Sequence, residues 1–154
     1  MAEQKMSLMG VGGKIAAVFV IYLAVTAGIS LWAAPLFQIT AEYRGALTVA
    51  GIVIAIAGFA LNLTAALQMM RAHRSGVLAS GGWYAVFLHP MYTFQILITI
   101  PGVLLLFNSW LVLTAWPVVF AAFKKFAKEE ERYLANQFGD EYRTYKEKVF
   151  CKFL

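Results

Sequence analysis

Long apolar runs separated by short polar connections dominate the pattern of residues along the chain. No Lys, Arg, Asp or Glu occurs within residues 15–41, 45–70 or 75–123. A helix needs about 20 predominantly apolar residues to cross the hydrocarbon core of a bilayer. The first two runs meet this length singly, and the third is long enough for two crossings. The pattern therefore predicts an all-α, polytopic membrane protein with about four transmembrane helices.

Helix-breaking residues set the expected limits of these helices within one domain, 1–154. The first span is expected to stop near Pro35, and Asn108-Ser109 divides the third run into two arms. Pro101 and Pro117 are expected to kink these arms, because proline removes a backbone hydrogen bond. We expect the spans at about residues 14–34, 46–70, 91–107 and 110–126.

Small residues recur along the second expected span, at Gly51, Ala55, Gly58 and Ala65. In membranes, small residues allow two helix backbones to approach closely. Asn62 in the same span is expected to form a hydrogen bond to a neighbouring helix rather than to contact a ligand. One face of this span is therefore predicted to be a packing surface.

After Phe126 the pattern changes to that of amphipathic helices at the membrane surface. Leu134 and Phe138 lie four residues apart, and Gly139 is suited to end a helix. Tyr142 and Tyr145 then recur at helical spacing. We expect cytoplasmic helices over 127–150 that cover the mouth of the bundle.

Charge changes the picture by orienting the chain. The protein is 61% hydrophobic and 14% charged, with a formal net charge of +5. Its basic residues do not form a nucleic-acid patch, since they stand at the ends of the expected spans (Lys5, Lys14, Arg71, Arg74, Lys124, Lys125 and Lys128). The positive-inside rule then places both termini in the cytoplasm. A single cysteine, Cys151, excludes an intramolecular disulfide and a cysteine-built metal site, and no metal is expected.

Residues 71–92 are too apolar for a solvated loop and too rich in glycine for a regular helix. Ser80-Gly81-Gly82 is a turn signal, and His89-Pro90 predicts a helix start, because proline is favoured at the first helical position. Irregular backbone at membrane depth is tolerated where protein buries it or where it lines a cavity. This segment is therefore predicted to form the wall of a site.

Two sets of ionisable residues are candidates for chemistry. An ionisable side chain at the mouth of a span, such as His89, is a functional candidate, although a lone histidine also serves as a structural hydrogen-bonding residue. For Glu129, Glu130 and Glu131 the residue types alone favour a solvated helix face over a functional role. They do not decide between these alternatives.

Taken together, the motifs resemble a known family. The run Leu88-His89-Pro90-Met91-Tyr92 is followed by Glu130-Glu131-Arg132-Tyr133-Leu134 and then by Phe138-Gly139-Asp140-Glu141-Tyr142-Arg143-Thr144-Tyr145. This order is similar to that of the isoprenylcysteine carboxyl methyltransferase family and the related phospholipid methyltransferases. The resemblance covers roughly residues 71–145, about half of the chain.

The resemblance implies an enzyme that uses S-adenosylmethionine to methylate a small or lipidic acceptor at the cytoplasmic membrane face. The cofactor-binding positions that it implies are Tyr84, His89, Tyr92, Glu130 and Glu131. No catalytic residue is assigned, and His89 is the candidate for one. The implied partners are the bilayer and a lipophilic or small-molecule acceptor that enters from it, with no nucleic acid.

Leu88 stands where this family usually carries an arginine, a bidentate partner for carboxylate or phosphate. This departure weakens the case for a prenylcysteine carboxylate as the acceptor and leaves the acceptor open. Two alternatives remain for the chain as a whole. One is an NADPH-dependent membrane reductase of the related sterol reductase type, and the other is a degenerate, non-catalytic family member.

Overall fold

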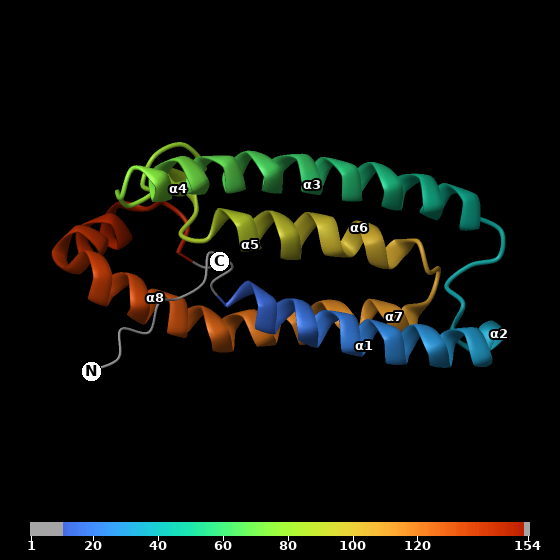
Figure 1. The fold of residues 1–154 in the computed structure, drawn as a ribbon. Helices are drawn as coiled ribbons and strands as arrows, with labels where there is room; N and C mark the ends of the chain where they lie inside the picture. The colour runs from blue at the N-terminus through green and yellow to red at the C-terminus, as the bar shows by residue number, and fades with distance from the viewer. Residues whose placement is uncertain (1–10, 153–154) are drawn as a thin grey trace.

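The computed structural model describes residues 11–152 as an elongated bundle of helices (Figure 1). Three helices are long and apolar enough to cross a membrane, namely Gly12–Trp32, Arg44–Arg74 and Trp110–Lys148. The remaining expected crossing corresponds to Pro90–Leu105, a shorter apolar helix. Its 16 residues extend about 24 Å at 1.5 Å per residue. Over the described residues the fold is all-α, which confirms the predicted class of polytopic membrane protein.

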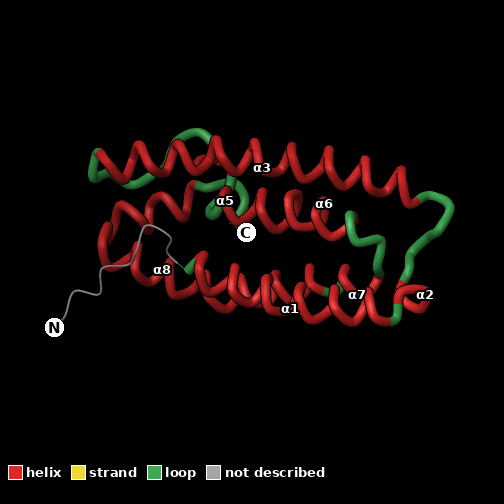
Figure 2. Tube along the Cα trace, turned by 45° about the vertical axis from the view of Figure 1, so that its right-hand side comes forward, coloured by secondary structure: helices red, strands yellow, loops and turns green. Residues whose placement is uncertain are grey.

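The helices lie in layers, which Figures 1 and 2 show from two directions. Helix α3 (Arg44–Arg74) packs on the central segment formed by α5 (Pro90–Phe94), the π-helix η1 (Gln95–Thr99) and α6 (Ile100–Leu105). On the other side, α8 (Ala115–Lys148) packs against α1 (Gly12–Trp32). The short α7 (Trp110–Leu113) lies against α1 and leads into α8, and α2 (Ala34–Phe37) follows α1.

Large apolar side chains project outward from α1 and α3. Trp32 is 89% exposed, and Val25, Ile56 and Phe59 are also exposed. The core instead lies between α1, the central segment and α8, where Ile96, Leu104, Val112, Val119 and Phe123 are buried. Exposure of so large an apolar surface to water is unfavourable, so we infer that these outward faces contact lipid.

Backbone contact between α3 and the central segment confirms the predicted packing surface. A Cβ atom added to Gly58 would lie 2.6 Å from the Thr99 backbone nitrogen, and one added to Gly102 would lie 2.5 Å from that of Ala55. Asn62 Nδ2 donates to the Met91 carbonyl at 2.7 Å, as expected for an interhelical hydrogen bond. These glycines are therefore required by the distance between the helices.

The π-helix explains how the chain accommodates Pro101. The Ile100 N–H bonds to the carbonyl of Gln95, five residues earlier. The same pattern one residue further on would need an N–H from Pro101, which has none. The Ile96 carbonyl instead accepts a hydrogen bond from Trp116 Nε1 at 2.7 Å. A kink was predicted at this proline, and the structure has a π-helix immediately before it. The Ile96 carbonyl that is left without a backbone partner is bonded by a side chain of α8.

The C-terminal region differs from the expected arrangement. No helix boundary separates the fourth span from the surface helix, since α8 runs without interruption past Phe126. The reason is that no Gly or Pro occurs there, and Phe123 and Ala127 continue one buried face. The predicted break does occur at Gly139, whose φ of 53° turns the last segment back toward the bundle.

Charged helix ends gather at one end of the bundle, which we call the site end. It contains the start of α1, the end of α3, α4 (Trp83–Val86), the start of α5 and the part of α8 after Phe126 (Figure 1). The opposite end, called the distal end, contains α2 and the connections 38–43 and 106–109.

Candidate functional site

A cavity of about 420 Å³ lies at the site end, between residues 69–92 and α8. The segment before α5 contributes Leu78, Tyr84, Leu88 and His89, and α5 itself contributes Tyr92. Helix α8 contributes Glu130, Tyr133, Leu134 and Phe138 on one side and Tyr145 beyond the turn at Gly139. The volume is in the range of small-molecule and cofactor sites.

The wall before α5 is held in place by two neighbouring elements. Gln68 Oε1 of α3 accepts the Trp83 N–H at 3.0 Å at the start of α4. Gly82, with a φ of 59°, forms the turn there, and a Cβ at this position would lie 2.7 Å from Gln68 Oε1. The predicted glycine turn therefore also provides room for a side chain of α3.

The chain after α8 forms the other support. Residues 149–152 run beside 85–88, where the Cys151 N–H donates to the Val86 carbonyl at 2.7 Å and the Leu88 N–H donates to the Cys151 carbonyl at 3.0 Å. Val149, Tyr142 and Tyr145 pack with Leu78 and Leu88 in a small apolar cluster. The backbone that carries His89 is thus held directly by the end of the described chain.

Tyr92 and Glu130 form the polar centre of the cavity. The Tyr92 hydroxyl donates to Glu130 Oε2 at 2.9 Å and connects α5 to α8. Tyr84 lies on the same cavity, where burial, reinforced by the nearby Glu130 carboxylate, raises the pKa of its hydroxyl. Tyr84 therefore keeps its proton at neutral pH and is available as a hydrogen-bond donor.

Glu131 points to a different set of partners. Its Oε1 lies 3.4 Å from His89 Nε2, and its Oε2 accepts a hydrogen bond from Lys146 Nζ. These two partners, the His89 hydrogen bond first, lower the pKa of the Glu131 carboxyl to about 2. Consecutive residues of a helix point about 100° apart, which explains why the two adjacent glutamates differ in environment.

Four of the five predicted site residues, Tyr84, His89, Tyr92 and Glu130, line the cavity together. The fifth, Glu131, does not line it but contacts His89 from behind. Lys146 escaped the sequence reasoning, because 15 residues separate it from Glu131 and only the turn at Gly139 brings them together. The glycine was the available signal, but it does not specify which residues meet.

Charge in the cavity is sparse and negative. Among the described lining residues, Glu130 is the only Asp, Glu, Lys or Arg. Two histidines, His73 and His89, also line the cavity. The position with the missing arginine, Leu88, is 4% exposed and belongs to the apolar cluster. The cavity therefore favours cationic over anionic groups near Glu130.

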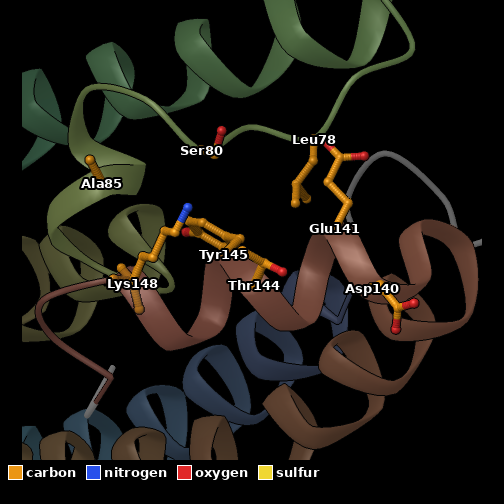
Figure 3. A pocket seen from close by; sticks show the side chains of 9 residues that line it. Leu78, Ser80, Ala85, Asp140, Glu141, Thr144, Tyr145 and Lys148 are labelled. Atoms are coloured by element: carbon orange, nitrogen blue, oxygen red, sulfur yellow. The ribbon is translucent and has the colours of Figure 1, made fainter.

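A second, more open hollow of about 620 Å³ lies on the other side of Leu78 and Tyr145, which line both spaces. Figure 3 shows it between the 78–85 segment and the last turns of α8, with Tyr145 on its α8 wall. Its charged side chains are Asp140, Glu141 and Lys148, all of them exposed. This hollow faces the surroundings more openly than the cavity at Glu130.

These features define a polytopic membrane protein with a largely apolar cavity that contains a few ionisable residues at one end of its helix bundle. The sequence matches the model of the phospholipid methyltransferase family over residues 45–141, more than half of the chain. The chain therefore belongs to the phospholipid methyltransferase family, which confirms the resemblance found in its motifs. Searches of curated proteins and of solved structures return no match.

Proposed function

We propose that this protein transfers a methyl group from S-adenosylmethionine to a lipidic acceptor that carries a basic nitrogen. The observation that carries the proposal is the cavity at the site end in which Glu130, Tyr92, His89 and Tyr84 meet. Family membership supports methyl transfer as the reaction class. The residues that line the cavity then indicate which cofactor and which class of acceptor fit it.

The residues present fit the proposed cofactor. The Glu130 carboxylate is suited to hold an ammonium or ribose hydroxyl group, and its hydrogen bond from Tyr92 fixes its orientation. Aromatic rings favour a nearby sulfonium cation by about 0.5–2 kcal/mol. When bound, S-adenosylmethionine supplies an activated methyl group, so that the protein needs mainly to align two reactants and exclude water.

The acceptor class follows from the lining of the cavity. Its only formal charge is negative, and Leu88 offers no partner to a carboxylate or phosphate at the reacting end. An amine head group suits this environment better than the carboxylate of a prenylcysteine. Apolar residues from α3, from the segment that follows it and from α8, namely Met69, Val77, Leu134 and Phe138, line the same cavity and suit the adjoining acyl or alkyl part.

The alternative of a nicotinamide-dependent reductase receives less support. The phosphates of NADPH are normally held by arginine, lysine or backbone N–H groups at a helix start. None of the described residues that line the cavity is Lys or Arg. We therefore favour a cationic cofactor for this site.

We further propose that the site end faces the cytoplasm, with both termini on that side. The start of α1, the end of α3 and the charged part of α8 lie at this end (Figure 1). Lys14, Arg71 and Arg74 belong to these segments, and the positive-inside rule assigns such a surface to the cytoplasm.

Isothermal titration calorimetry in detergent tests the proposal. S-adenosylhomocysteine is expected to bind the wild type and to bind Glu130→Gln and His89→Ala at least tenfold more weakly, since a charge-assisted contact contributes about 1.5–3 kcal/mol. Glu129→Gln is the matched control, because Glu129 pairs with Lys14 outside the cavity. Binding of NADPH without S-adenosylhomocysteine would indicate a reductase, and binding of neither would indicate a non-catalytic protein.

The acceptor is tested by transfer of radiolabelled methyl groups from S-adenosylmethionine. The purified protein is reconstituted into phosphatidylcholine vesicles that contain phosphatidylethanolamine or farnesylcysteine. Labelling of phosphatidylethanolamine but not of farnesylcysteine is expected. The opposite preference would overturn the choice of a basic nitrogen while leaving the cofactor proposal intact.

A further inference from the structure

A buried histidine, a carboxylate and an ammonium group form a chain that leads away from the cavity. His89 lines the cavity with its side chain only 5% exposed. Glu131 contacts it through one oxygen at 3.4 Å and holds Lys146 with the other. Glu131 and Lys146 do not line the cavity, so direct contact with the cofactor does not explain this pair behind His89.

The contacts among His89, Glu131 and Lys146 determine which ring nitrogen of neutral His89 carries the proton. The Glu131 carboxyl has a pKa lowered to about 2, so it is ionised at neutral pH and only accepts hydrogen bonds. Nε2 of His89 must therefore carry the hydrogen. Nδ1 then has the free lone pair, and no described residue forms a hydrogen bond with it. An imidazole held in this way is suited to accept a proton at Nδ1.

Other ionisable groups surround His89 at greater remove. The Tyr92 ring lies 6.0 Å from the His89 ring, between centroids, and directs its hydroxyl to Glu130. Ionisable residues of the neighbouring elements are Tyr84 in α4, His73 at the end of α3, and Glu130, Glu131, Tyr142, Tyr145 and Lys146 on α8. Among these, only Glu131 has a hydrogen bond to the His89 ring in the part of the chain that the structure describes.

We propose that His89 accepts a proton from the acceptor's ammonium group and that Lys146, acting through Glu131, is a positioning residue that adjusts this step. The inference rests on the proposed function. The N–H bond of the ammonium breaks, its electron pair remains on nitrogen as a nucleophilic lone pair, and the proton bonds to Nδ1. Glu131 stabilises the resulting imidazolium, and Lys146 keeps Glu131 oriented while opposing an excess of positive charge.

The two supporting residues should act in opposite directions. Without the Lys146 ammonium, the Glu131 charge acts on the imidazole alone and stabilises its protonated form. Without the Glu131 charge, the imidazolium loses its partner and faces the Lys146 ammonium. If either residue had a purely structural role, the two substitutions would not be expected to shift the titration of His89 in opposite directions, because a loss of packing does not favour one protonation state.

Nuclear magnetic resonance of ¹⁵N-histidine in detergent measures the effect directly, because the chain contains only two histidines. His73→Gln assigns the His89 signals. We expect Lys146→Met to move the titration midpoint of His89 upward by about 0.5–1 pH unit and Glu131→Gln to move it downward by a similar amount. Lys146→Arg, which keeps the charge, should restore the wild-type midpoint. An unmoved midpoint, or movement of both variants in one direction, would overturn the proposal.

Two further measurements separate this proposal from the proposed function. The acidic limb of methyl transfer to phosphatidylethanolamine vesicles should shift with the midpoint, upward in Lys146→Met and downward in Glu131→Gln. If the wild type binds S-adenosylhomocysteine but the limbs do not move, the role of His89 in proton transfer is wrong and the function stands. If S-adenosylhomocysteine does not bind, both the function and the catalytic role fail, even where the titrations are coupled.

Discussion

The two ends of the bundle are closed by similar backbone pairings but contain different chemistry. At the distal end, the Ile39 N–H donates to the Asn108 carbonyl at 3.1 Å, and at the site end Leu88 and Cys151 are paired in the same way. Around Asn108 the partners are neutral, including Thr40 and a contact between the Ser30 and Ser109 hydroxyls at 2.7 Å. Around Leu88 they include a carboxylate, a histidine and a cavity.

This difference separates structural from functional polarity in a small membrane protein. Asn108 is 5% exposed, and both ends of its amide are satisfied by the backbone of Thr40. Ionisable groups beside a cavity incur a desolvation cost that neutral pairs avoid, and they are retained where they bind or react. The distal end therefore holds the helices together, and the site end holds the chemistry.

The largest expected effect on stability comes from the helix contact that both ends depend on. Gly102→Ala should lower the free energy of unfolding by about 1–3 kcal/mol, because its Cβ would overlap the backbone of Ala55. Thermal unfolding in detergent measures this effect. The control is Gly28→Ala, since a Cβ there meets nothing within 4 Å. Equal stability of the two variants would contradict the close approach of α3 and α6.

Asn108→Ala tests the distal end by itself. Loss of the hydrogen bonds to Thr40, which leaves backbone groups unpaired, should cost about 1–3 kcal/mol of stability. S-adenosylhomocysteine affinity should stay at the wild-type value, because this residue lies at the end opposite the cavity. Asn136→Ala, at an exposed position on α8, is the control for stability. A large loss of affinity in Asn108→Ala would erase the distinction between the ends.

Cys151→Pro tests the site end in the complementary way. Proline removes the N–H that donates to the Val86 carbonyl and loosens the backbone before His89. One hydrogen bond contributes about 1 kcal/mol, so affinity for S-adenosylhomocysteine should fall about fivefold in calorimetry. Cys151→Ala keeps the backbone pairing and should bind like the wild type. Loss of binding in Cys151→Ala would instead assign a role to the thiol.

Acid should also lower the stability of the fold, through Glu131. Its pKa falls from 4.5 to about 2 in the folded protein, so its ionised form stabilises the fold above pH 4.5. This contribution is lost as the pH falls from 4.5 toward 2. Unfolding temperatures of the wild type and Glu131→Gln should therefore differ by a constant amount near neutral pH and converge in acid. A difference that persists at the lowest pH would assign the effect to packing.

Much of the fold could be predicted because hydropathy, glycine and proline act locally. The apolar runs indicated the helices, the small residues of α3 marked its packing surface, and Gly139 marked the turn in α8. The continuity of α8 was missed, because a change from apolar to charged residues changes the surroundings of a helix without breaking it. Composition therefore predicted that a helix is present better than it predicted where the helix begins and ends.

The candidate site could be predicted only in part, for a related reason. Motif resemblance grouped His89, Tyr92 and Glu130, and all three line the cavity, while their role in cofactor binding stays a prediction. It grouped Glu131 with Glu130, although helical geometry turns the two side chains toward different partners. The pairings of Lys146 and Cys151 have no periodic signature, since both depend on how the chain returns after Gly139.

The pairing of residues 85–88 with Cys151 also bears on when the cavity forms during synthesis. The helices that anchor the chain precede this residue, so they can enter the bilayer while the last part of α8 is still within the ribosome. The wall that carries His89 obtains its partner segment only after Cys151 has been made. An unfinished chain is thus anchored before its cavity is closed, and membrane insertion and maturation of the site become separate events in time.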